Sequence, residues 1–323
     1  MSNKRSPLSL IFTTVFIDLI GFGIVIPVLP VYAERFGASA WVIGWLLGIY
    51  SGVQLLCAPL LGKLSDRIGR RPVLLVSLLG TSLGFLLMGA ARSLSLLFVA
   101  RIIDGATGGN ISTALAYIAD VTSPKERSRK MGIIGAAFGV GFILGPAIGG
   151  LLGHFSLAAP FYFAAALAFG NSIAVFFYLP ESLPPEHRQK EKGSSFFQTL
   201  RSSERNFLLI LTTYFLTTAA FSLLTATYPL FTERRFGYGV IENGYIFASQ
   251  GLLSAFIQGG LLGWLIKHFR EKRLVFLGTF LLAVNLFALP MGSTIPWLLA
   301  ATAGLAVGHG LGFKVAEEEA DKI

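Results

Sequence analysis

Apolar segments of membrane-spanning length recur along most of this chain, separated by short polar joints. A run of about 20 apolar residues, rising 1.5 Å per helical residue, matches a hydrocarbon core about 30 Å thick. Backbone polar groups in lipid must be satisfied within their own segment, so we predict helices. The predicted spans are 8–30, 43–62, 73–92, 95–118, 131–153, 158–180, 206–230, 242–266, 274–291 and 295–313.

The composition excludes a soluble domain and shows no sign of an enzyme. The chain is 54% hydrophobic and only 13% charged, whereas a soluble domain is about 25% charged. No metal-ligand spacing, nucleophile elbow or phosphate loop is present, so we expect no enzymatic activity, no cofactor and no metal. Cys57 is the only cysteine, which excludes an intrachain disulfide.

The positive charge predicts topology rather than nucleic-acid binding. The net charge is +9, but most of the 26 Lys and Arg residues lie in alternate joints, on the side that would also hold the N-terminus. By the positive-inside rule that side is the cytoplasm. No basic face interleaved with aromatic residues is present, so we expect no nucleic-acid partner.

A polar stretch and an internal repeat divide the chain. We predict a six-helix half over 1–180, a cytoplasmic linker over 181–205, a four-helix half over 206–313 and a polar tail over 314–323. "LPVYAERFG" at the end of the first span resembles "YPLFTERRFG" at the end of the seventh. Such repeats are typical of transporters whose substrate site lies between the halves near the membrane midplane.

Four motifs in register resemble those of the major facilitator superfamily, in its tetracycline-exporter and drug/proton antiporter branch. They are "GKLSDRIGRR" (Gly62–Arg71), "DLIGFGIVIPVLP" (Asp18–Pro30), "RIIDGATGG" (Arg101–Gly109) and "GFILGPAIGG" (Gly141–Gly150). The resemblance implies an all-α membrane protein of the major facilitator fold. Because that family has twelve spans, it also implies that the C-terminal half is incomplete, as in a truncated member.

The resemblance implies two sets of conformational residues. The first set is a cytoplasmic gate that forms in one state and breaks in the other, made of Gly62, Asp66, Arg67, Gly69, Arg70, Arg71 and Asp120. We expect Gly62 to let its helix approach a neighbour closely. The second set is the antiporter motif, whose small residues recur at four-residue steps and allow tight helix contact: Gly141, Gly145, Pro146, Gly149 and Gly150.

Ionisable residues inside predicted spans point to a proton and substrate site. A charge in the membrane is costly, so Asp18, Arg101 and Asp104 should face the protein interior. Arg101 and Asp104 lie three residues apart on one helix, so they can pair with each other. Neutral polar side chains that we assign to the same cavity are Gln54, Asn110, Gln250, Gln258 and Asn285.

Together these features predict a multi-pass protein of the bacterial inner membrane, surrounded by lipid, with a cytoplasmic N-terminus. We expect it to export a small hydrophobic drug or metabolite in exchange for protons by alternating access. The acidic residue that tetracycline exporters carry in the third span is absent from Leu83-Gly84-Phe85, which favours a substrate other than tetracycline. The alternatives are proton-coupled uptake of a sugar or organic acid, and a truncated remnant that does not transport.

Overall fold

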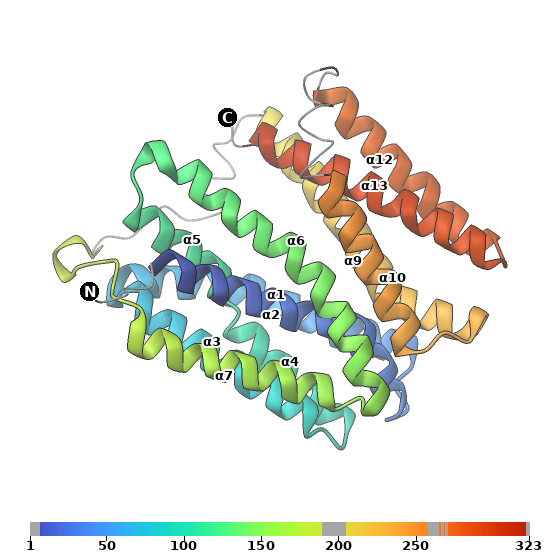
Figure 1. Cartoon of the computed structure of the whole chain (residues 1–323), viewed down its shortest axis with the longest axis horizontal. Coiled ribbons are helices and arrows are strands. Elements are labelled where there is room, and N and C mark those ends of the chain that lie inside the picture. Colours follow the sequence, from blue (N-terminus) through green and yellow to red (C-terminus); the bar gives the residue numbers. More distant parts are fainter. Residues whose placement is uncertain (1–6, 189–204, 258–264, 266–267, 269–270, 321–323) are drawn as a thin grey trace. The chain divides into compact units, whose positions relative to one another are not determined.

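Every regular element within the described residues is a helix (Figure 1). The computed structural model describes residues 7–188, 205–257, 265, 268 and 271–320. In the first part of the chain lie α1 (Pro7–Glu34), α2 (Ala40–Ile68), α3 (Arg70–Gly89), α4 (Leu94–Ala106), α5 (Asn110–Val121), α6 (Pro124–Phe155), α7 (Ala159–Tyr178) and the short 3₁₀ helix η1 (Pro185–His187). Later come α9 (Arg205–Phe236), α10 (Val240–Phe256), α12 (Glu271–Ala288), the 3₁₀ helix η3 (Leu289–Met291) and α13 (Ile295–Ala320).

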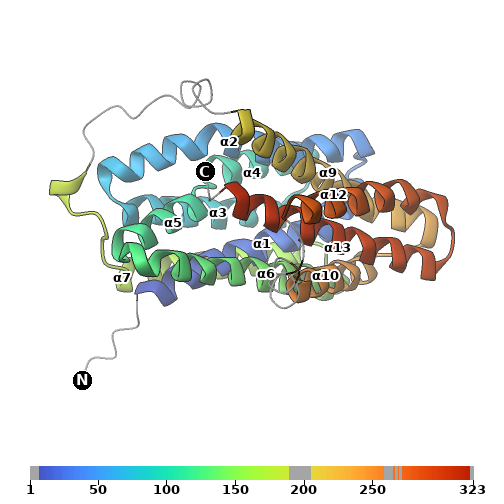
Figure 2. The same cartoon turned by 90° about the horizontal axis from the view of Figure 1, so that it is seen from above.

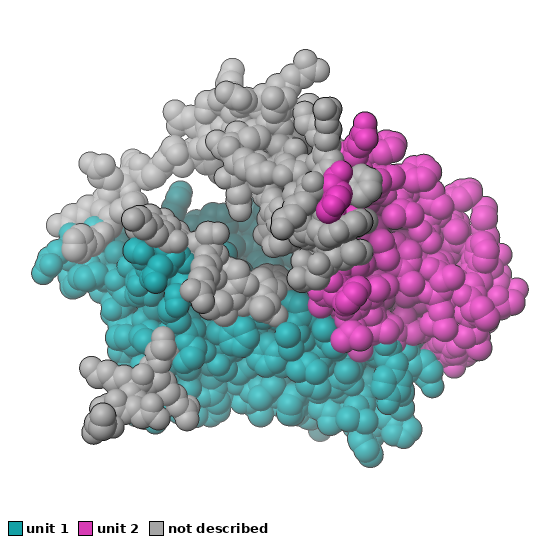
Figure 3. Space-filling view, turned by 45° about the horizontal axis from the view of Figure 1, so that its top comes forward, with its two compact units in different colours: residues 1–190, 239–245 teal, residues 191–238, 246–323 magenta. Residues whose placement is uncertain are grey.

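The chain forms two compact units, coloured separately in Figure 3. Unit 1 comprises Met1–Lys190 and Gly239–Tyr245, and unit 2 comprises Glu191–Tyr238 and Ile246–Ile323. Unit 1 holds α1 to α7 together with the first turns of α10, while unit 2 holds α9, the rest of α10, α12 and α13.

The segment predicted as one span over 95–118 is two helices. α4 ends at Ala106, α5 begins at Asn110, and Thr107 to Gly109 form the break. The backbone carbonyl of Gly108 in this break accepts a hydrogen bond of 2.9 Å from Gln54 Nε2 on α2. A neighbouring helix thus satisfies a carbonyl that the interrupted helix leaves free, which is the usual way in which a membrane helix tolerates a break.

Local signals explain where several helices begin and end. Ser39 and Ser93 are N-caps. Each hydroxyl accepts a hydrogen bond of 3.4 Å from the backbone N–H of the residue three positions later. Gly37 (φ 78°) follows α1, and Gly237 (φ 70°) follows α9. These two glycines occupy equivalent places in the repeated sequences, and both adopt the left-handed conformation that ends a helix.

Unit 1 is packed around α1, which runs alongside α6 and α7 (Figures 1 and 2). α1 and α6 approach closely because glycines face each other: a Cβ on Gly145 would lie 2.7 Å from the Cα of Gly23. α3 packs against α4 and α7, and α2 packs against α4. A buried apolar cluster fills one end of the unit, and it includes Ile11, Leu74, Leu78, Ala114 and Tyr117.

Unit 2 is built on the pairing of α12 with α13, and α9 packs against α13. A Cβ on Gly308 would lie 2.6 Å from the backbone nitrogen of Leu282, so this pair also depends on a small residue. The Tyr228 and Thr302 hydroxyls share a buried hydrogen bond of 2.8 Å between α9 and α13. α13 continues to Ala320, beyond the predicted end at 313, because Ala, Glu and Lys in its last turns favour helix.

Five described helices are long and apolar enough to cross a membrane. These spans are Pro7–Glu34, Ala40–Ile68, Arg70–Gly89, Ala159–Tyr178 and Arg273–Met291, and shorter apolar helices cover Gly139–Phe155 and Ile295–Gly308. Many large apolar side chains lie on the outside, among them Leu55 and Phe177, which are 74% and 69% exposed. Exposed faces of this kind are typical of helices in contact with lipid.

Candidate functional site

Ionisable and aromatic side chains from four helices of unit 1 line a small pocket, which we call the Asp18 pocket. α1 contributes a carboxylate, α2 a tyrosine, α3 a hydroxyl and a phenyl ring, and α4 an ion pair. The lining residues are Asp18, Phe22, Val25, Tyr50, Thr81, Phe85, Arg101 and Asp104.

Asn110 at the start of α5 holds the carboxylate of Asp18. Its Nδ2 donates to Asp18 Oδ1 at 2.8 Å and lies 3.5 Å from Thr81 Oγ1. Asn110 is almost fully buried, whereas Asp18 is partly buried and lines the pocket. The break before α5 therefore places an amide donor at the level of the carboxylate.

Arg101 and Asp104 form a buried ion pair on α4, as their spacing predicts. Nη1 of Arg101 lies 3.4 Å from Asp104 Oδ2, and the two residues are 2% and 4% exposed. Nε of Arg101 donates to Leu46 O at 3.5 Å, and its guanidinium lies 4.2 Å from the ring centroid of Tyr50. This cation–π contact and the ion pair offset part of the free-energy cost of removing the guanidinium from water.

Glycines let the helices that carry these groups approach one another. A Cβ on Gly84 of α3 would lie 2.8 Å from Asp104 Cβ, and one on Gly105 of α4 would lie 2.6 Å from the carbonyl oxygen of Tyr50. Gln54 bridges Tyr50 and the break after α4, since its Nε2 lies 3.1 Å from the Tyr50 hydroxyl and 2.9 Å from Gly108 O.

The Asp18 pocket contains two acids and one permanent cation. With both carboxylates ionised it has a net negative charge, and one proton makes it neutral. Because unbalanced charge in a dry site costs several kcal/mol, such a pocket favours the uptake of one proton or of one positively charged group.

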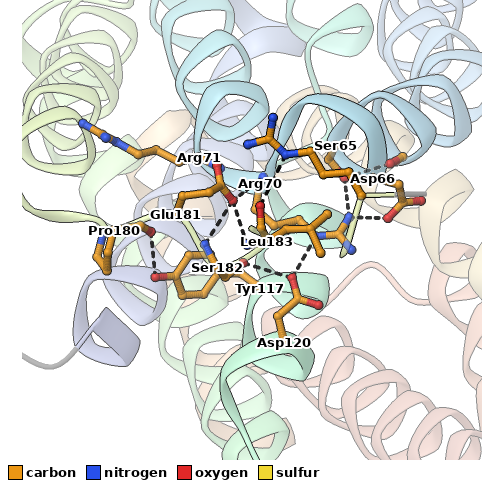
Figure 4. A network of polar contacts seen from close by, with 12 residues as sticks. Ser65, Asp66, Arg70, Arg71, Tyr117, Asp120, Pro180, Glu181, Ser182 and Leu183 are labelled. Carbon is orange, nitrogen blue, oxygen red and sulfur yellow. Dashed lines mark hydrogen bonds and ion pairs between the residues drawn. The ribbon is translucent and has the colours of Figure 1, made fainter. Parts of the chain in front are cut away.

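A second polar cluster, the Arg70 network, lies at the other end of α3 and α5 (Figure 4). Arg70 is its centre: Nη1 lies 2.6 Å from Asp66 Oδ1 and 2.6 Å from Ser65 Oγ, and Nε lies 3.0 Å from Asp120 Oδ2. Three predicted gate residues from α2, α3 and α5 are thus brought together. Gly69, with φ 113°, makes the sharp turn between α2 and α3.

Glu181 is a member of the Arg70 network that the sequence analysis did not select. Its carboxylate accepts the backbone N–H of Arg70 at 2.8 Å and of Arg71 at 3.2 Å, and so caps α3. A Cβ on Gly69 would collide with this carboxylate. Ser182 Oγ next to it donates to Asp120 at 3.0 Å. An acid just after the last apolar span of a half is the signal that could have identified Glu181.

Three other predicted gate residues, Arg71, Arg67 and Gly62, make different contacts from those of the Arg70 network. Arg71 donates to the carbonyl of Phe176 on α7, and its guanidinium lies 5.7 Å from that ring. The side chain of Arg67 is exposed. The prediction that Gly62 makes a close helix contact is wrong for the described part of the chain, where no atom lies within 4 Å of a Cβ placed on it.

The antiporter-motif residues bring α6 against α1 and the start of α10. Gly141 lies against Leu19, Gly145 against Gly23, and Gly149 against Ile24 and Val28 of α1. Pro146 contacts Gly23 from within α6. A Cβ on Gly150 would lie 3.1 Å from Gly244 Cα.

The neutral polar residues assigned to the second half lie in unit 2 or outside the described residues. Gln250 is 8% exposed, and its Nε2 has no hydrogen-bond partner among the described residues. Asn285 donates to Leu281 O at 2.8 Å within α12 and lies against Gly304 of α13. Gln258 falls outside the described residues.

Comparisons with known proteins agree on one family. The Major Facilitator Superfamily profile matches residues 11–315. The class D tetracycline resistance protein of Salmonella ordonez is 36% identical over 318 residues, which cover 96% of this chain and 79% of that protein. Multidrug resistance protein 2 of Bacillus subtilis (strain 168) is 30% identical over 281 residues, which cover 85% of this chain and 70% of that protein.

Solved structures give the same result for the fold. The human organic anion transporter MFSD10 (TETRAN) has a TM-score of 0.70 and 27% identity, covering 98% of this chain and 86% of that chain. A bacterial homologue of the human lysosomal transporter Spinster, inward-facing and unoccupied, has a TM-score of 0.81. It is 17% identical, and the match covers 98% of this chain and 75% of that chain, so it supports the fold alone.

Proposed function

Because the chain belongs to the Major Facilitator Superfamily, we propose that it exports a small hydrophobic drug or metabolite in exchange for protons. It is an integral membrane transporter that resembles tetracycline and multidrug efflux proteins. The relatives' names support efflux of a drug-like molecule. The aromatic side chains of the Asp18 pocket, Phe22, Tyr50 and Phe85, suit such a substrate.

The observation that carries the proposal is the position of Asp18. Its carboxylate lies at the Asp18 pocket, held by Asn110 and accompanied by the Arg101–Asp104 pair. A proton and a cationic or polar substrate group would compete for the same negative charge. Competition of this kind couples two ligands, since each one leaves when the other binds.

We assign alternation between the two sides of the membrane to the remaining predicted residues. The Arg70 network would be the gate on the cytoplasmic side, because it joins α2, α3 and α5 through one arginine. The glycine face of α6 would allow α1 and α6 to slide while still in contact. The protein would lie in the bacterial inner membrane, with its N-terminus in the cytoplasm.

Transport in inverted membrane vesicles tests the proposal. A lipophilic fluorescent dye is added to the medium outside vesicles that contain the full chain. A proton gradient is then imposed, with the vesicle interior acidic. Exchange predicts that the dye accumulates inside only while the gradient lasts. Dye movement together with protons would indicate uptake. If no gradient-dependent movement of any tested dye, sugar or organic acid occurs, the chain is a non-transporting protein.

A further inference from the structure

Helices α3 and α5 carry two rows of polar side chains that meet at both ends, which we call the α3–α5 seam. Residues three, four or seven apart share one helix face. The α3 row is Arg70, Ser77 and Thr81, and the α5 row is Asn110, Thr113, Tyr117 and Asp120.

Side-chain contacts join the rows at each end of the seam. Nδ2 of Asn110 lies 3.5 Å from Thr81 Oγ1 at the end beside Asp18. Nε of Arg70 lies 3.0 Å from Asp120 Oδ2 at the other end (Figure 4). Asp120 lies ten positions after Asn110, a distance of about 15 Å along the axis of α5. The seam therefore runs between the two clusters described above.

The seam contains buried polar atoms without a protein partner, from its Asp18 end to its middle. Ser77 Oγ, Asn110 Oδ1 and Thr113 Oγ1 accept or donate no hydrogen bond among the described residues. The three residues are 0%, 1% and 1% exposed. Ser77 lies beside the start of α5, because a Cβ on Gly109 would lie 3.3 Å from Ser77 Oγ. Thr113 is one helical turn further on, and its backbone N–H donates to the Gly109 carbonyl at 3.1 Å.

Unpaired buried polar atoms of this kind favour the binding of water. A buried polar group left unpaired costs about 1–3 kcal/mol, and buried water typically binds where two to four otherwise unsatisfied groups converge. Asn110 and Thr113 lie within one turn of α5, and Ser77 lies beside Gly109 at the start of that turn, so water bound there would have several such groups as partners. The apolar residues Leu74, Leu78 and Ala114 of the same two helices are fully or almost fully buried and would shield the water from lipid.

We propose that the α3–α5 seam binds ordered water at Ser77, Asn110 and Thr113, and that this water carries protons between Asp18 and the Arg70 network. The proton-route part rests on the proposed function, whereas the water site does not. Each hydroxyl or water takes one proton from one side and releases another on the far side. The Asn110 amide relays none, but it holds Asp18 with Nδ2 and leaves Oδ1 to bind water.

Charged and titratable groups at the two ends define the route. Asp18, Tyr50, Arg101 and Asp104 line the pocket at one end. At the other end lie Asp66, Arg70, Asp120 and Glu181. Tyr117 is the one described residue of the seam with an ionisable side chain between them, and its hydroxyl donates to Pro180 O at 2.9 Å.

Hydroxyl-radical labelling by X-ray radiolysis tests the water site without a substrate. Bound water generates radicals locally, so in the full chain in lipid nanodiscs we expect Tyr117 and Leu74 to be labelled although both are 0% exposed. Ile24, equally buried in α1, is the internal reference. In a variant carrying Ser77→Ala and Thr113→Val, labelling of Tyr117 and Leu74 should fall to the level of Ile24.

The matched control removes two hydroxyls from the same helices outside the seam. Ser82→Ala with Ser112→Ala should leave the labelling unchanged, because Ser82 donates to Ala165 O and Ser112 to Gly109 O. Thr113→Ser keeps Oγ and should also retain it. Equal labelling of Tyr117 and Ile24 in the unaltered protein, or equal loss in both double variants, overturns the water site.

Dye efflux in inverted vesicles tests the proton route. We expect the rate in the Ser77→Ala and Thr113→Val variant to fall about fivefold, the rate equivalent of one lost hydrogen bond, while the Ser82→Ala and Ser112→Ala control is unchanged. Lost labelling with unchanged efflux overturns the proton route. If the unaltered chain moves no dye, the proposed function fails, and with it the proton route, while the labelling still decides the water site.

Discussion

Asn110 donates a hydrogen bond of 2.8 Å to the carboxylate of Asp18, a residue 92 positions earlier in the sequence. The contact joins the start of α5 to the middle of α1, and it depends on the break between α4 and α5. The helix break at Thr107 to Gly109 therefore places the amide that holds Asp18, the one acidic side chain that α1 contributes to the Asp18 pocket.

The first prediction concerns the charge of Asp18. Asp18→Asn should abolish gradient-driven dye efflux while leaving the amount of protein in the membrane unchanged. Asparagine has nearly the same size and keeps an oxygen for Asn110, but it cannot exchange a proton. Efflux in inverted vesicles and an immunoblot of the membranes measure the two effects. Thr13→Asn, at an exposed site on the same helix, is the control, and full efflux by Asp18→Asn would remove this residue from the mechanism.

The second prediction concerns the donor. Asn110→Leu should slow efflux by about one to two orders of magnitude, because a hydrogen bond to a charged group is worth about 1.5–3 kcal/mol. Asn171→Leu is the matched control, since this buried amide donates to Thr14 Oγ1 at 3.1 Å and not to Asp18. Equal losses in both variants would mean that any buried amide matters for packing, and that Asn110 has no particular role in transport.

The family and the all-helical fold could be predicted from the sequence, and both predictions are confirmed. Hydrophobic length and charge identify membrane helices because lipid imposes the same constraint on each of them. The four motifs in register were together specific enough to name the family. The pairing of Arg101 with Asp104 was also predictable, because residues three apart on a helix are neighbours.

The long-range partners of Arg101, Asn110 and Arg70 were not predictable in the same way. Tyr50, Thr81 and Glu181 reach their partners across dozens of sequence positions, so no local pattern reveals them. The helix break at Thr107 to Gly109 was missed because glycine is tolerated inside membrane helices. Only the acceptor role of Gly108 O, satisfied by Gln54 of α2, shows why the chain can break there.

The third prediction concerns the Arg70 network. Arg70→Lys should lower stability by about 1.5–3 kcal/mol, because one ammonium group cannot replace a guanidinium that contacts Ser65, Asp66 and Asp120 together. Thermal denaturation of the purified protein in detergent measures the change. Arg67→Lys, at an exposed side chain in the same motif, should leave the melting temperature within error. An Arg70→Lys protein as stable as the unaltered one would argue against this network.

The fourth prediction concerns topology. In a Cys57→Ser background, which has no cysteine, Arg67→Cys should react with a membrane-impermeant maleimide only in inverted vesicles. Arg92→Cys should react only in spheroplasts, in which the outer membrane and cell wall have been removed. Both side chains are exposed, so access depends on the side of the membrane alone. The reverse pattern would place the N-terminus outside and contradict the assignment made from the positive charges.

The fifth prediction concerns the contact between α1 and α6. Gly145→Val should greatly reduce the amount of folded protein, because the Cβ alone would lie 2.7 Å from Gly23 Cα and 2.8 Å from Ile20 O. These atoms belong to a helix backbone, which cannot move aside as a flexible side chain can. Gly170→Ala in α7 is the control: no described atom lies within 4 Å of its Cβ position, and the helix should gain about 1 kcal/mol. Fluorescence-detected size-exclusion chromatography of both variants measures folded protein. A normal monodisperse peak for Gly145→Val would show that α1 and α6 do not need this close approach.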